Sequence, residues 1–78
     1  MNFQPIVSSN LEEAAYDAKS RTGVIHFKNG TAYEYTKFLP GLWKKFEKTF
    51  PGKNGASAGK FFFANIKKLP CRQLDNWK

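Results

Sequence analysis

The sequence predicts an α+β fold: a three-stranded antiparallel β-meander packed on one face by two C-terminal α-helices. One observation is an Asn-Gly pair flanked by β-branched and aromatic residues, which is typical of a β-hairpin. The other is a second half in which apolar residues recur at helical spacing after Pro40 and again after Ser57. At 78 residues, the chain is expected to form a single domain spanning residues 1–78, with a small core rich in aromatic side chains.

The hairpin spans residues 24–35, and its loop length decides which side chains face the core. A two-residue loop at Asn29-Gly30 would mix apolar and charged groups on one face. A three-residue loop with Gly30 in the left-handed conformation pairs Phe27 with Thr31 and is the register that we predict. One face then carries Ile25, Phe27, Tyr33 and Tyr35, and the other carries His26, Ala32 and Glu34.

The segment before the hairpin is ambiguous. Pro5 favours an extended start and at most a short edge strand at Ile6-Val7. The stretch 11–16 contains good helix formers, yet it is short and runs into turn-forming residues at 17–20. We therefore predict that Ala14–Tyr16 forms the first strand of the meander, with Tyr16 on the core face.

The first helix is predicted to begin at Pro40, because proline suits the first helical position. Its apolar stripe consists of Leu42, Trp43, Phe46 and Phe50. Lys44 and Lys48 lie opposite this stripe and Lys45 lies at its edge. The helix is expected to end at Phe50-Pro51.

The second helix is predicted from about Ala58 to Lys68, with Ser57 as its N-cap. Its buried stripe consists of Phe62, Ile66 and Leu69, with Phe63 at the edge. Phe61 falls on the other side, near Asn65 and Lys68, and is expected to be exposed. Residues 71–78 are expected to be a tail, with Leu74 and Trp77 able to dock.

Several segments, taken in order, resemble one family. They are Val7-Ser8-Ser9-Asn10-Leu11, Tyr16-Asp17, Phe27-Lys28-Asn29-Gly30, Tyr33-Glu34-Tyr35, Ser57-Ala58-Gly59-Lys60-Phe61-Phe62 and Ile66-Lys67. Over residues 6–70 the chain resembles the KTSC domain, a small domain found at the C-terminus of some lysyl-tRNA synthetases and alone in bacterial and phage proteins. The resemblance implies a domain without an assigned activity, linked to RNA through the synthetases. Two residues depart from the family pattern. The family tends to have a polar residue at the position of Phe63 and an apolar residue at the position of Gly23.

Charge is distributed unevenly along the chain. Basic and acidic residues cancel over residues 1–43, so the net charge of +7 resides in residues 44–78. A basic half of this kind indicates an anionic partner, either nucleic acid or an acidic protein, with a membrane surface less favoured.

The first functional hypothesis is a small basic nucleic-acid-binding module, with RNA favoured, that contacts phosphates through a lysine-rich helical face. Its candidate residues are Lys44, Lys45, Lys48, Lys53, Gly59, Lys60, Phe61, Lys67, Lys68 and Arg72. Tyr33 and Tyr35 are candidates for stacking on bases, although the predicted register favours their packing in the core. The alternative is a protein-interaction module, an adaptor or phage-type inhibitor that docks an acidic protein. A solvated helix face that serves only solubility is the third interpretation.

The loop before the second helix has two weak motif matches. Gly52 and Gly55 are spaced as in the phosphate-clamping loop of KH domains, and the N-terminus at Gly59-Lys60 could bind an anion. A nucleotide-binding phosphate loop is excluded, because Asn54 replaces its first glycine and Phe61 replaces the magnesium-binding serine or threonine.

We expect no enzymatic activity, no metal site and no cofactor. His26 is the single histidine and is predicted on the solvent face, while Cys71 is the single cysteine and is not expected to form a catalytic pair with it. A lone cysteine fits a reducing compartment, and no signal peptide is apparent, so a soluble cytoplasmic protein is expected. A monomer is favoured, with dimerisation through a sheet edge as the alternative.

Overall fold

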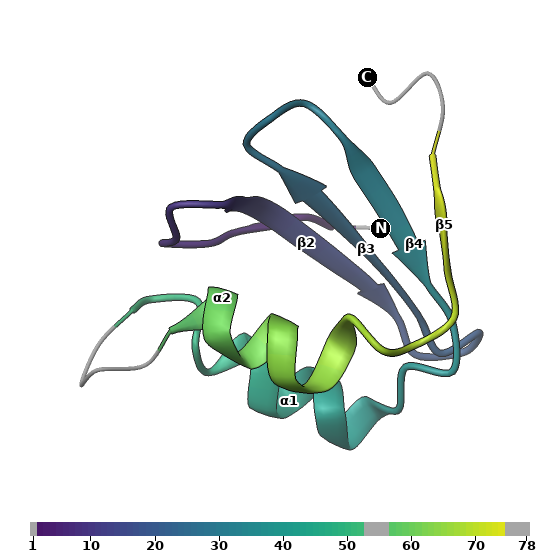
Figure 1. Ribbon diagram of the computed structural model, residues 1–78. Coiled ribbons are helices and arrows are strands. Elements are labelled where there is room, and N and C mark those ends of the chain that lie inside the picture. The colour runs from purple at the N-terminus through teal and green to yellow at the C-terminus, as the bar shows by residue number, and fades with distance from the viewer. Residues whose placement is uncertain (1, 53–56, 75–78) are drawn as a thin grey trace.

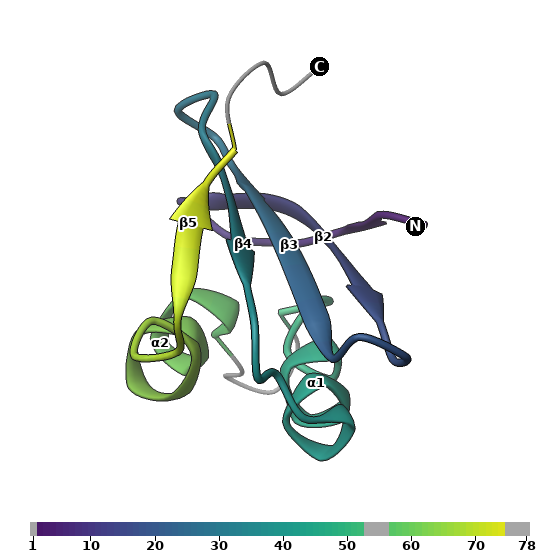
Figure 2. The ribbon, with the colours of Figure 1, turned by 90° about the vertical axis from the view of Figure 1, so that its right-hand side faces the viewer.

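The computed structural model describes residues 2–52 and 57–74. It has an antiparallel sheet of five strands in the order β1-β2-β3-β4-β5, and both helices lie side by side beneath the same face of that sheet (Figures 1 and 2). The strands are β1 Gln4–Pro5, β2 Leu11–Asp17, β3 Thr22–Phe27, β4 Ala32–Tyr35 and β5 Cys71–Gln73. The helices are α1 Pro40–Glu47 and α2 Ala58–Phe61, and a π-helical turn at Phe62–Ile66 continues α2. The predicted α+β class is confirmed, whereas the prediction of a three-stranded sheet was wrong.

The hairpin of β3 and β4 has the predicted register. Ile25 pairs with Tyr33, and the Phe27 N–H donates to the Thr31 carbonyl at 2.8 Å. Gly30 closes the three-residue loop with φ at 92°, a conformation that costs glycine little because it has no Cβ. This register places Ile25 and Tyr35 in the core.

Strand β2 is longer than the predicted Ala14–Tyr16, and the alternative of a helix at 11–16 is wrong. A β-bulge interrupts its pairing with β3 between Leu11 and Glu13. The extra residue lets Leu11 and Ala14 both reach the core, although an uninterrupted strand alternates faces. Their three-residue separation also occurs on one face of a helix, so the pattern alone could not separate the two structures.

The two outer strands were not predicted where they occur. Strand β1 lies at Gln4–Pro5, just before the expected Ile6-Val7, and its two residues pair with Ala14 and Glu13. Strand β5 begins at Cys71, where a tail was expected, and pairs with the free edge of β4. All three residues of β5 are exposed, so no alternation of apolar side chains marks this strand in the sequence.

Both helices begin where the sequence predicts. Pro40 is the first residue of α1, and the Ser57 hydroxyl oxygen accepts the Lys60 N–H at 3.2 Å at the start of α2. Helix α1 ends at Glu47, earlier than the predicted end at Phe50-Pro51. Phe50 is still buried, but it lies in the turn that follows the helix. After α2 the chain widens into the π-helical turn, which the Lys67 N–H closes by donating to the Phe62 carbonyl at 2.9 Å.

The core is centred on Phe38, which is fully buried between the sheet and α1. Its ring packs edge-on against Tyr16 and Trp43, at centroid distances of 5.4 and 5.8 Å. The Tyr16 hydroxyl also donates to the Phe38 carbonyl. A Cβ at Gly23 would lie 2.6 Å from Phe38 Cδ2, so the ring occupies the space of a side chain at that position.

We expect Gly23→Ala to lower the free energy of unfolding by about 1–3 kcal/mol, because the new methyl group would collide with the Phe38 ring. Chemical denaturation monitored by circular dichroism measures this change. Gly41→Ala is the matched control, since a Cβ there meets nothing within 4 Å and alanine favours a helix. The packing argument fails if Gly23→Ala unfolds at the same denaturant concentration as the unsubstituted protein.

Candidate functional site

The outer sides of the two helices carry a group of exposed lysines. Each lies on α1, on α2 or directly after one of the helical segments, and none of them contributes to the core. This surface, called the helical lysine face below, consists of Lys44, Lys45, Lys48, Lys60, Lys67 and Lys68. Because α1 and α2 lie side by side under one face of the sheet (Figure 2), their lysines belong to the same layer of the molecule.

The packing of α1 leaves its lysines in solvent. Trp43 and Phe46 turn into the core, and Lys44 and Lys48 fall on the opposite side of the helix. Glu47 is half-buried and accepts a hydrogen bond from Gln4 Nε2 at 2.5 Å. Within residues 40–52 and 57–74, Glu47 is the single acidic residue, and β1 already holds its carboxylate.

Acidic side chains collect on the other face of the sheet. Glu13, Asp17 and Glu34 lie on the face opposite Ile25, because side chains alternate along a strand. Glu13 Oε2 lies 3.3 Å from His26 Nδ1, and Glu34 Oε1 lies 2.8 Å from Arg72 Nε. The molecule is therefore charged asymmetrically, with lysines on the helical side and carboxylates on the open side of the sheet.

Some of the predicted site residues lie apart from the helical lysine face. Arg72 is on β5, where it pairs with Glu34, and this carboxylate raises the pKa of the guanidinium. An anion site was expected at Gly59-Lys60, but the backbone N–H of Lys60 already donates a hydrogen bond to the Ser57 hydroxyl oxygen. Lys53 and the greater part of the Gly52-to-Gly55 loop lie outside the described residues. Gly52 itself has φ at 67°, and its N–H donates to the Thr49 carbonyl at 3.1 Å.

The expectation that Phe61 is exposed was wrong. Phe61 is half-buried and stacks on Phe46 of α1, with ring centroids 5.8 Å apart and an interplanar angle of 19°. Helix α2 contacts α1 through Phe61, and the π-helical turn that continues it contacts the sheet through Phe62. This helical segment is therefore covered on two sides, whereas a single buried stripe was predicted. Among the described residues, the exposed aromatic side chain is that of Phe63, at 59% of its full accessibility.

The two tyrosines of β4 differ in burial. Tyr35 is 3% exposed and packs edge-on against Phe62 at 5.6 Å. Tyr33 is half-buried and packs against Phe27 at 5.8 Å. Burial raises the pKa of the Tyr35 hydroxyl, and the neighbouring Cys71 and Tyr33 raise it further. These contacts agree with the predicted preference of both rings for packing.

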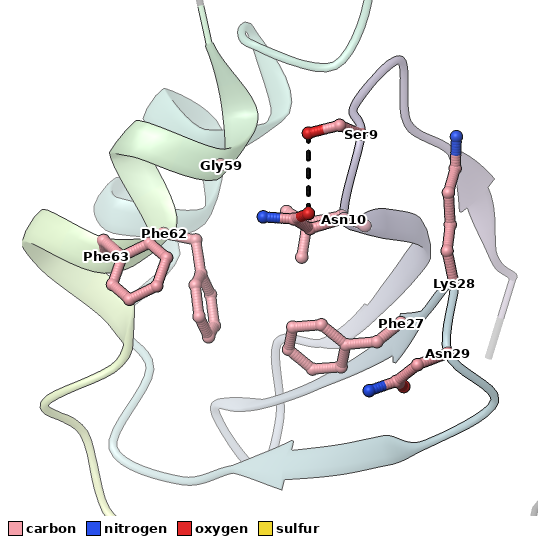
Figure 3. A pocket seen from close by; sticks show the side chains of 9 residues that line it. Ser9, Asn10, Phe27, Lys28, Asn29, Gly59, Phe62 and Phe63 are labelled. Carbon is pink, nitrogen blue, oxygen red and sulfur yellow. Dashed lines mark hydrogen bonds between the residues drawn. The ribbon is translucent and has the colours of Figure 1, made fainter.

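A hollow lies between the β3–β4 turn, the β1–β2 turn and the start of α2 (Figure 3). We call it the hairpin hollow. Its lining consists of Ser9, Asn10, Leu11, Phe27, Lys28, Asn29, Gly59, Phe62 and Phe63. Gly59 was a predicted site residue, but the others were not. The turn-forming residues at 8–10 and 28–30 were the available signal, and the sequence alone did not show that these turns converge.

Among the described residues, the single cysteine and the single histidine lie on opposite faces of the sheet. Cys71 is exposed and pairs with Tyr35 on β4, whereas His26 is half-buried on the opposite face of the sheet. In residues 2–52 and 57–74, no three His, Cys, Asp or Glu side chains come together as metal ligands would. The described helices also lack the length and apolar character needed to cross a membrane.

Comparison with known proteins identifies relatives of this arrangement. The family model of the KTSC domain matches residues 7–69. Among solved structures, the crystal structure of a KTSC domain protein from Yersinia pestis is similar, with a TM-score of 0.79 and 29% sequence identity. The similarity covers 94% of this chain and 96% of that chain. A comparison with curated proteins finds no match.

We expect the alkaline stability of the protein to depend on Tyr35. Its pKa is raised on folding above the ordinary tyrosine value of about 10, so the stability linked to its proton is fully present below about pH 10. That stability is lost as the pH rises from there toward the higher folded-state pKa. Tyr35→Phe should therefore show a shallower decrease in the free energy of unfolding above pH 10, measured by denaturant titration. Identical pH dependence in both proteins would contradict the assignment.

Proposed function

The chain belongs to the KTSC domain family. Because this domain also occurs in some lysyl-tRNA synthetases, we propose that the protein is a small nucleic-acid-binding module with RNA favoured. It would contact phosphates through the helical lysine face. The observation that carries the proposal is the separation of charge, with exposed lysines on the helices and carboxylates on the opposite side of the sheet.

Lysines without acidic neighbours suit a phosphate backbone. A solvated helix face commonly mixes lysine with glutamate, but the one acidic side chain of the described helical region is held by Gln4. Phosphate contacts release condensed counterions and supply most of the affinity in non-specific binding. Lys44 on α1 and Lys60 on α2 are exposed, so both helices contribute to such an interface.

The same face is less suited to an acidic protein. Protein–protein interfaces are depleted in lysine and bury aromatic residues at their centre. In α1 the large aromatic side chains, Trp43 and Phe46, are used in the core of the domain. Flexible lysine stems instead follow a polyanion without a fixed geometry, which agrees with low sequence specificity.

The double variant Lys44→Glu/Lys60→Glu tests the proposal by reversing one charge on each helix. We expect binding to single-stranded RNA to weaken by about tenfold or more at low salt, and the salt dependence (log K against log salt) to become shallower by about 1.4. Fluorescence anisotropy with labelled tRNA, single-stranded RNA and duplex DNA at two or more salt concentrations measures both quantities.

The double variant Lys19→Glu/Lys37→Glu is the matched control, because it changes the net charge equally at exposed positions outside the helices. It should retain most of the affinity. Equal weakening by both double variants would mean that net charge alone attracts the nucleic acid. If the unsubstituted protein binds none of the three nucleic acids, the proposal is wrong and an acidic protein partner becomes the better explanation.

A further inference from the structure

We propose that the hairpin hollow accepts one unstacked base of a single-stranded nucleic acid, while the neighbouring lysines hold the flanking phosphates. The inference rests on the proposed function and adds to it a site and a preference for single strands. Bases in a duplex are stacked and paired, whereas those of a single strand can turn out toward a protein surface.

The hollow has a suitable size and composition. Its volume of about 360 Å³ lies at the lower end of the usual range for small-ligand sites, roughly 300–1,000 Å³. Phenylalanine rings from the hairpin and from the π-helical turn after α2 form its apolar part, and the two turns between strands supply its polar part (Figure 3). A planar ring with polar edges, such as a nucleobase, matches this combination.

Three rings are available for contact with a base. Phe27 and Phe62 pack edge-on at 5.5 Å, and Phe62 and Phe63 do so at 5.9 Å. Phe62 is buried, so it forms the floor of the hollow, whereas Phe63 is 59% exposed and forms its outer wall. Stacking on aromatic rings tolerates any base, because every base has a π-face.

Two asparagine side chains supply hydrogen-bond donors. Asn29 Oδ1 accepts hydrogen bonds from the Thr31 N–H at 3.0 Å and from the Thr31 hydroxyl at 2.7 Å. A backbone N–H can only donate, so the Asn29 amide nitrogen must face away from that turn. Figure 3 shows the Asn10 amide nitrogen directed across the hollow toward α2. Among the described residues neither amide nitrogen has an acceptor, and the carbonyl oxygens and ring nitrogens of bases are acceptors.

Positive charge surrounds the hollow. Lys28 lines it directly, and Lys60 follows the lining residue Gly59. Lys67 Nζ lies 4.6 Å from the centroid of the Phe63 ring, in cation–π contact. Lys60 and Lys67 also belong to the helical lysine face, so a strand whose base enters the hollow would pass its phosphates onto that face.

The test compares two strands that carry the same phosphates. One is a short single-stranded RNA, and the other has the same backbone but lacks its central bases. We expect the unsubstituted protein to bind the complete strand about five- to tenfold more tightly in fluorescence anisotropy. Phe63→Ala should bring this ratio of affinities close to one, because it removes the outer wall of the hollow.

Leu39→Ala is the matched control, since Leu39 is 54% exposed and does not line the hollow. It should keep the ratio of the unsubstituted protein. Asn10→Ala provides a second variant in the hollow if Phe63→Ala does not fold, as judged by its thermal melting, and should also reduce the ratio. Equal binding of the two strands by the unsubstituted protein, or a ratio that Phe63→Ala and Asn10→Ala leave unchanged, overturns the hollow as a base site but leaves phosphate binding intact. Binding of neither strand overturns both proposals.

Discussion

The contact between the Phe38 ring and the vacant side-chain position of Gly23 determines how the helices meet the sheet. A larger residue on β3 would displace the ring, since a Cβ at Gly23 would already lie 2.6 Å from it. Lys37 adopts a φ of 55° just before Phe38, and the Phe38 N–H donates to the Arg21 carbonyl at 2.9 Å. The chain thus turns sharply from β4 to α1 around a fixed ring.

Every later element depends on that placement. With α1 held by Phe38 and Trp43, its Phe46 ring is presented to Phe61, and α2 is positioned against both α1 and the sheet. Two sides of the helical segment 58–66 are then covered, and its exposed remainder carries Phe63 and Lys60. The helical lysine face and the hairpin hollow are therefore adjacent as a result of core packing, and the proposed base and phosphate contacts share one helix.

The fold was predictable from the sequence where a single residue has a local effect. The Asn-Gly turn set the hairpin register, Pro40 marked the start of α1, and Ser57 marked the cap of α2. Prediction failed where the structure depends on distant segments. Strand β5 forms because β4 offers a free edge, and its own exposed residues carry no apolar pattern. The lysines of the candidate site could be identified from the charge of the sequence alone. The hairpin hollow could not, because it forms between two turns and a helix that are distant in the sequence and meet only in the folded protein.

The separation of charge between the helices and the open sheet face also bears on the rate at which the protein meets a partner. Near any polyanion, the lysine side is attracted and the carboxylates at Glu13 and Glu34 are repelled, so the molecule rotates toward one orientation before contact. Fewer collisions are then wasted on the wrong face, which raises the association rate constant. Salt weakens this orienting torque over distances longer than the screening length of about 8 Å at physiological ionic strength. The orienting effect of this charge separation is therefore strongest at low ionic strength.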